Sequence, residues 1–107
     1  MTPIRRQRNV KIVATLGPAS DTLEMIRSLF LAGADVFRLN MSHGTQADIA
    51  RRHDLIRQVE DEVGRPIAIL ADLQGPKLRV GVFGDGPQLL QEGASFRLDL
   101  DKADGDA

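Results

Sequence analysis

The sequence predicts an α/β fold, in which three parallel strands alternate with two helices and a short antiparallel region follows. Residues 10–72 alternate β-branched runs with segments of helical periodicity, in the order strand, helix, strand, helix, strand. The connections between these segments are short, which favours parallel strands joined by right-handed crossovers. After residue 72 the pattern changes, because glycine and proline separate short segments of alternating polar and apolar residues.

The first strand is expected at residues 10–15, where a β-branched run precedes a glycine–proline pair. Asp21, with Glu24 three residues later, predicts the start of a helix that the aspartate caps. Gly33 is expected to end this helix. The apolar residues that recur in it at helical spacing are Leu23, Ile26, Leu29 and Phe30.

A second strand, a second helix and a third strand fill residues 35–71. The strand at 35–40 is followed by a helix that begins at Thr45 and ends at Gly64. The apolar stripe of this helix consists of Ile49, Ile56, Val59 and Val63. Residues 67–71 show no polar alternation, which predicts a strand covered on both faces. Three parallel strands are too few for a closed barrel of about 250 residues, so we expect the front part of a longer protein.

The region after residue 74 is predicted to form short antiparallel strands. Residues 84–86, Gly-Asp-Gly, are typical of a hairpin turn. The expected strands are residues 77–83, 88–90 and 95–100. The domain boundary is therefore placed here, with residues 1–74 in one domain and 75–107 in a second.

Composition and charge exclude several classes of protein. The 14 Lys and Arg against 15 Asp and Glu give a net charge of −1, which argues against general nucleic-acid binding. The lack of cysteine excludes disulfides and thiolate chemistry. No apolar run reaches the ~18 residues of a membrane span, and no apolar signal segment follows Arg5, Arg6 and Arg8, which we expect to be solvated. These features predict a cytoplasmic protein that binds neither nucleic acid nor membrane.

Polar residues gather at the carboxyl ends of the predicted strands. Arg38, Asn40 and Ser42 share one face of the second strand, where a buried parallel strand is normally apolar. The third strand ends with Asp72, and the first ends with Thr15, which we expect to close that strand. Because α/β folds build their sites at these strand ends, the arrangement indicates a binding site.

The kinds of side chain indicate a site for phosphate and a metal ion. The planar donor fork of Arg38 suits phosphate or carboxylate. The oxygen atoms of Asn40, Ser42 and Asp72 suit a hard cation. Lys77 and Arg79 add two more cations after Asp72. An anion site beside a cation site is what phosphoryl transfer needs, since its catalysis is mostly positioning and charge neutralisation.

Three segments resemble the first three strand–loop signatures of pyruvate kinase. They are Lys11–Ser20, Phe37–Gly44 and Ala71–Arg79, and the match runs in order from about residue 8 to residue 100. In that family a small mobile β domain interrupts a (β/α)8 TIM barrel after its third strand. The resemblance therefore implies the first three β/α units of the barrel in residues 1–74 and the start of the inserted antiparallel β domain, the lid, in residues 75–107.

The resemblance also implies an activity and a set of residue roles. The full-length enzyme would transfer a phosphoryl group from phosphoenolpyruvate to ADP with Mg²⁺, giving pyruvate and ATP in glycolysis, as a homotetramer. Arg38 would be the catalytic and substrate-binding residue that holds the transferring phosphoryl group. The nucleotide phosphates would lie against Asn40, Ser42, His43 and Arg79. The ligands of the monovalent-cation site would be Asn40, Ser42, Asp72 and the carbonyl of Leu73.

Two residues depart from the potassium-dependent members of the family. Many of those members have Thr where Leu73 stands and Glu where Lys77 stands. The ammonium of Lys77 near Asp72 would supply the positive charge that K⁺ otherwise brings. We therefore expect that the full-length enzyme does not require K⁺.

The family's catalytic lysine, its Mg²⁺-binding acids and the threonine near the enolate lie in later barrel strands, beyond residue 107. The 107 residues are therefore expected to be inactive alone.

Other interpretations of the same residues remain open at this point. A signalling receiver module would use Asp72 as its phosphoacceptor, but it needs acids after the first strand, where residues 16–20 have none. An aldolase-type phosphoenolpyruvate/pyruvate barrel shares the fold but does not explain the loop at 72–79. For His43, contact with phosphate and a role in loop structure are equally expected, and Asn40 and Ser42 also suit a helix or loop cap.

Overall fold

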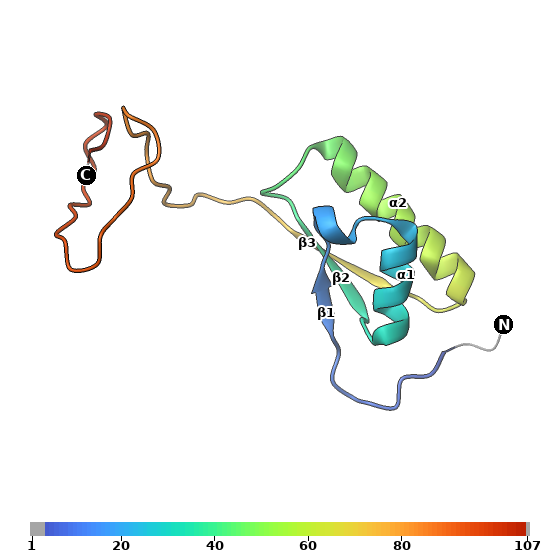
Figure 1. The fold of residues 1–107 in the computed structure, drawn as a ribbon. Helices are drawn as coiled ribbons and strands as arrows, with labels where there is room; N and C mark the ends of the chain where they lie inside the picture. The colour runs from blue at the N-terminus through green and yellow to red at the C-terminus, as the bar shows by residue number, and fades with distance from the viewer. Residues whose placement is uncertain (1–3, 107) are drawn as a thin grey trace. The chain divides into compact units, whose positions relative to one another are not determined.

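The computed structural model describes residues 4–106 of the chain (Figure 1). Its elements in chain order are β1 (Val13–Thr15), the short 3-10 helix η1 (Pro18–Ser20), α1 (Leu23–Ala32), β2 (Val36–Asn40), α2 (Gln46–Val63) and β3 (Ala68–Asp72). The chain divides into two compact units after Gly75. These helices and strands all belong to the first unit.

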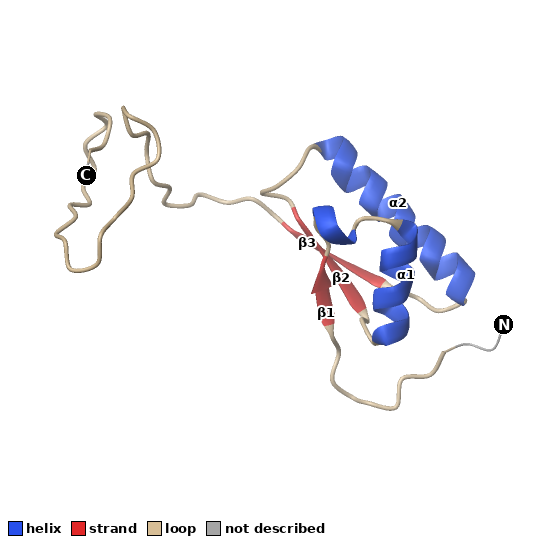
Figure 2. Cartoon of the chain, viewed as in Figure 1, coloured by secondary structure: helices blue, strands red, loops and turns tan. Residues whose placement is uncertain are grey.

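The three strands form one parallel sheet in the order β1–β2–β3, as the strand–helix alternation predicts. The register places Thr15 beside Arg38, and Asn40 beside Asp72. Helices α1 and α2 lie over one face of this sheet (Figure 2). Because side chains alternate along a strand, the polar residues of β2 lie on the face turned away from the two helices.

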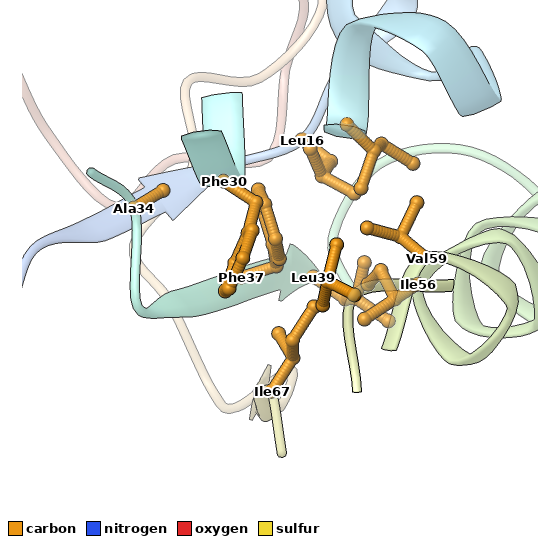
Figure 3. Close-up of a cluster of buried hydrophobic side chains, with 10 residues drawn as sticks. Leu16, Phe30, Ala34, Phe37, Leu39, Ile56, Val59 and Ile67 are labelled. Atoms are coloured by element: carbon orange, nitrogen blue, oxygen red, sulfur yellow. The ribbon is translucent and has the colours of Figure 1, made fainter. Parts of the chain in front are cut away.

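The hydrophobic core fills the space between the sheet and the two helices (Figure 3). Its buried residues are Leu16, Ile26, Phe30, Ala34, Phe37, Leu39, Ile56, Val59, Val63 and Ile67. Full burial of one large apolar side chain contributes about 1.5–3 kcal/mol, so this cluster holds the first unit together. The expectation that the third strand is covered on both faces is wrong for the described residues. Leu70 is 43% exposed, since both helices lie over the other face.

The helix ends show which capping predictions are right. Thr45 caps α2 and forms a capping box with Asp48, and Gly64 ends this helix in the left-handed region. The cap of α1 is Thr22, whose side chain accepts from the Met25 amide, so the prediction that Asp21 caps this helix is wrong. None of the helices within residues 4–106 is long and apolar enough to cross a membrane.

The N-terminal segment, expected to be solvated, is fastened to the start of β2. Arg6 Nε and Arg8 Nη1 each donate to the Asp35 carboxylate at 3.1 Å, and the Ile12 amide donates at 2.8 Å. The Arg6 guanidinium also lies 4.7 Å from the centre of the Phe30 ring. The expectation for Arg6 and Arg8 is therefore wrong, because these arginines satisfy a nearly buried carboxylate.

The second unit, described by itself, contains a turn but no strand within residues 76–106. The Gly86 amide donates to the Phe83 carbonyl at 3.1 Å, which forms the predicted turn. The one isolated bridge, between Phe83 and Gly105, is parallel. The predicted antiparallel strands are absent from residues 76–106. Their apolar side chains, such as Leu78 and Leu98, are exposed and form no packed face that would stabilise a sheet. Short strand pairs without a packed face are marginally stable in water.

Candidate functional site

The candidate site is centred on Arg38, whose guanidinium connects all three strands. Its Nε donates to Asp72 Oδ2 on β3 at 3.0 Å, and its Nη2 donates to the same oxygen. Its Nη1 donates to Thr15 Oγ1 on β1 at 3.3 Å. Thr15 is level with Arg38, and Asp72 stands two residues further along the neighbouring strand on the same face. The register of the sheet therefore assembles the predicted cluster.

The Arg38–Asp72 pair is open to solvent. The Arg38 side chain is 30% exposed, and the Asp72 side chain is 45% exposed. Exposed ion pairs contribute only about 0–1 kcal/mol to folding stability. A guanidinium that is oriented by two neighbours yet accessible to solvent can still bind an anion such as a phosphoryl group.

Asn40 shapes the loop that leaves β2. Its Oδ1 accepts from the Ser42 amide at 3.0 Å, and its carbonyl oxygen accepts from the His43 amide at 3.3 Å. The bond from the Ser42 amide to Asn40 Oδ1 is the kind of contact expected if Asn40 caps the loop. The Ser42 side chain is half-buried and that of His43 is exposed, and neither has a protein hydrogen-bond partner within residues 4–106. Both can therefore contact a ligand at the strand ends.

The exits of β2 and β3 are joined by further hydrogen bonds. The Met41 amide donates to the Asp72 carbonyl at 3.0 Å. Gln74 Nε2 donates to the Met41 carbonyl at 2.6 Å. The sequence pattern predicts no role for Gln74, and it predicts for Thr15 only that this residue closes its strand. A polar residue two positions after the strand-end aspartate was the available signal for Gln74.

The other three predicted site residues follow β3 in the chain. Leu73 follows β3 directly and is 73% exposed. Lys77 and Arg79 belong to the second unit and are exposed. Their roles stay predictions, while Arg38, Asn40 and Asp72 are brought together.

The oxygen donors of the cluster include too few carboxylates for a divalent ion among residues 4–106, and Arg38 already bonds the carboxylate of Asp72. The structure contains no group of three or more His, Asp or Glu side chains able to hold a metal within residues 4–106. Asp72 is the one carboxylate in the predicted ligand set, and Asn40 lies beside it in register. A divalent ion such as Mg²⁺ prefers more carboxylate ligands or substrate phosphates.

Comparison with known proteins shows the family to which this chain belongs. The parallel sheet, with polar residues at its carboxyl edge, is that of an α/β protein, a class whose sites are normally built at this edge. A family model described as "Pyruvate kinase, barrel domain" matches residues 7–107. The chain belongs to the pyruvate kinase family, as the three sequence signatures indicated.

Several curated relatives carry the same name. The chain is 56% identical over 103 residues to a pyruvate kinase of Methylorubrum extorquens. The aligned region covers 96% of this chain and 22% of the relative. It is 50% identical to a pyruvate kinase of Agrobacterium vitis, with 96% of this chain and 21% of the relative covered. It is 47% identical to pyruvate kinase II of Salmonella typhimurium, with 95% and 22% covered. The chain thus spans about a fifth of the length of these relatives.

Proposed function

We propose that the full-length protein transfers a phosphoryl group from phosphoenolpyruvate to ADP, giving pyruvate and ATP in cytoplasmic glycolysis. The relatives that support this reaction are named pyruvate kinase. The observation that carries the proposal is the Arg38 guanidinium, oriented by Asp72 and Thr15 at the carboxyl edge of the sheet.

In this proposal Arg38 binds the transferring phosphoryl group. Developing charge on that group is stabilised by a donor that is already in position, which is the main source of catalysis in phosphoryl transfer. Asp72 and Thr15 fix the guanidinium plane, so little reorganisation is needed when the substrate binds. The nucleotide phosphates lie against Ser42 and His43, in a set that also includes Asn40 and Arg79.

The proposal requires one metal ion, Mg²⁺, which would neutralise the phosphate charge and whose protein ligands lie beyond this chain. In potassium-dependent members of the family, a monovalent cation would be held at the positions of Asn40, Ser42, Asp72 and the Leu73 carbonyl. The Lys77 ammonium would replace K⁺, because a fixed positive charge near Asp72 disfavours a second cation there.

The remaining architecture is proposed from the family. Residues 1–74 form the first three β/α units of a (β/α)8 barrel, and residues 75–107 begin the inserted antiparallel lid domain. The complete enzyme is a homotetramer. The 107 residues alone are inactive, since the catalytic lysine and the Mg²⁺-binding acids lie outside them.

The test is pyruvate formation by the full-length protein with Mg²⁺, comparing wild type with Arg38→Ala. The variant should lose about 10³-fold in kcat/KM, which corresponds to about 4 kcal/mol of transition-state stabilisation. Arg27→Ala is the matched control, because Arg27 pairs with Glu62 between α1 and α2, away from the strand ends. Wild type without activity would refute the reaction, whereas an active Arg38→Ala enzyme would refute the role of Arg38.

The potassium proposal has its own test. Rates in K⁺ and in tetramethylammonium, at equal ionic strength, should agree to within about 2-fold for wild type. Lys77→Glu should become dependent on K⁺, because the fixed ammonium is lost and a carboxylate is added. Strong activation of the wild-type enzyme by K⁺ would contradict the proposal.

A further inference from the structure

Arg52 is a buried cation that the proposed mechanism does not use. It lies on α2 with only 8% of its surface exposed. Its Nη2 pairs with Asp21 Oδ2 at 3.5 Å, and its buried Nε has no protein acceptor among the described residues. A Cβ placed on Gly44 would lie 3.7 Å from Arg52 Nη1. The guanidinium therefore lies beside two different loops.

These two loops both follow strands of the candidate site. Asp21 lies in the segment between β1 and α1. Gly44 belongs to the loop after β2, which begins at Met41 and includes Ser42 and His43. Gly44 has φ +78°, in the left-handed region, so this loop turns sharply at the point that faces Arg52. A Cβ on Gly44 would meet Asp48 at 3.4 Å and Arg52 at 3.7 Å, so both side chains lie next to this turn.

The charge of Arg52 acts on a carboxylate at each loop. The pKa of Asp21 is lowered mainly by a hydrogen bond from Arg51, and the charges of Arg51 and Arg52 lower it further. The pKa of Asp48 is lowered mainly by the Thr45 backbone amide, and the positive charges of Arg52 and Arg51 lower it further. Asp48 lies in the first turn of α2 and bonds Thr45, which ends the loop after β2, so Arg52 acts on Asp21 in one loop and, through Asp48, on the end of the other.

Burial of this guanidinium is poorly compensated. Its only ion-pair partner within residues 4–106 is Asp21, which also accepts a shorter bond of 2.6 Å from the exposed Arg51. Burying a charge with few partners costs stability, and replacing it by an apolar side chain of similar size is often neutral or stabilising. A residue that is kept buried at such a cost is typical of a functional region.

We propose that Arg52 is a positioning residue that couples the loops after β1 and β2 and holds Ser42 and His43 in place for the nucleotide. The nucleotide part rests on the proposed function. The coupling of the two loops by Arg52 does not, because it depends only on contacts within the first unit.

The experiment uses the full-length protein and compares Arg52→Met with Arg51→Met. Both variants remove one positive charge beside Asp21, but only Arg52 is buried beside Gly44. Backbone amide exchange of residues 17–22 and 41–48 should become faster by about 5-fold or more in Arg52→Met. Exchange of residues 66–72 should stay unchanged. In Arg51→Met only residues 17–22 should exchange faster, because Arg51 bonds the carbonyl and the carboxylate of Asp21, whereas residues 41–48 should resemble wild type.

Steady-state kinetics add a readout that general destabilisation would not produce. In Arg52→Met, KM for ADP should rise about 5-fold while KM for phosphoenolpyruvate changes less than about 2-fold, since Arg38 keeps Asp72 and Thr15. The melting temperature should stay within about 2 °C of wild type. Arg52→Lys, which keeps the charge but has only one donor centre, should give intermediate exchange.

Other results overturn the proposal. If amide exchange in both loops of Arg52→Met is as slow as in wild type, the coupling is refuted. If the KM values for ADP and for phosphoenolpyruvate rise equally, the specific role toward the nucleotide is refuted. If Arg52→Met melts at a much lower temperature while amide exchange in Arg52→Lys equals that of wild type, the role of Arg52 is purely structural and the proposal is refuted. Wild type without pyruvate kinase activity refutes the proposed function, and the exchange data then still decide whether Arg52 couples the loops.

Discussion

The two edges of the parallel sheet use the same kind of ion pair in opposite ways. At the amino edge, the Asp35 side chain is 7% exposed and accepts from Arg6, Arg8 and a backbone amide. At the carboxyl edge, Arg38 and Asp72 form their pair in partial contact with solvent. The chain can be followed from one edge to the other in Figure 1.

The difference lies in how fully each carboxylate is satisfied. Asp35 has protein donors on both oxygens, so a ligand would have to displace them. In the Arg38–Asp72 pair two of the three guanidinium nitrogens, Nε and Nη2, donate to one oxygen, Oδ2, and both side chains stay partly exposed to solvent. In α/β barrels the carboxyl edge carries the chemistry and the amino edge carries stability. We expect the arginine–aspartate pairs of this chain to follow that division.

Substitution of Asp35 should produce the largest loss of stability. Asp35→Asn leaves Arg6 and Arg8 facing a neutral amide, and breaking a buried pair in this way costs about 3 kcal/mol. Thermal unfolding of the full-length protein measures the effect, with Asp61→Asn on the exposed side of α2 as control. Equal melting temperatures for the two variants would remove the claim that the amino edge carries stability.

The same carboxylate predicts how stability depends on pH. The Ile12 amide, followed by Arg6 and Arg8, lowers the pKa of Asp35 below its ordinary value of 3.8. As the pH falls, Asp35 therefore takes up a proton in the unfolded chain before it does so in the folded chain. The stabilisation from Asp35 is complete well above pH 3.8 and is lost as the pH falls below 3.8. The gap in melting temperature between wild type and Asp35→Asn should be constant at neutral pH and should shrink below pH 3.8. A gap that widens in acid would contradict the assignment.

A smaller effect is expected at the cap of α2. Thr45→Ala removes the hydrogen bond from the Asp48 amide to Thr45 Oγ1, which is 3.1 Å long, and should cost about 1 kcal/mol. Ser28→Ala, at an exposed position on α1, is the control. Chemical denaturation measures both. If Thr45→Ala cost as much as Asp35→Asn, the carboxyl edge would carry as much stability as the amino edge.

Much of the first unit could be predicted from local patterns in the sequence. Gly64 and Thr45 bound α2 because they suit the backbone at a helix end, and such signals need no knowledge of the rest of the chain. Arg38 and Asn40 were recognised as site residues because polar side chains are costly in a buried strand. Parallel pairing then brought them to Asp72, as the order of strands and helices required.

The remainder depends on contacts between distant residues. Arg6 and Arg8 follow no pattern that reveals Asp35, which lies 27 or more residues away. Arg52 was passed over for the same reason, because an arginine on a helix is normally solvated. The cap of α1 was misplaced by one residue, since Asp21 and Thr22 are both good caps and Arg51 attracts the aspartate.

The division between the two edges is tested most directly by measuring kcat/KM and melting temperature side by side for Arg38→Ala and Asp35→Asn. Arg38→Ala should lose about 10³-fold in activity with a melting temperature within about 2 °C of wild type. Asp35→Asn should melt several degrees lower and, well below its melting temperature, keep kcat/KM within about 2-fold of wild type. The account would be contradicted if Arg38→Ala were active but unstable and Asp35→Asn were stable but inactive.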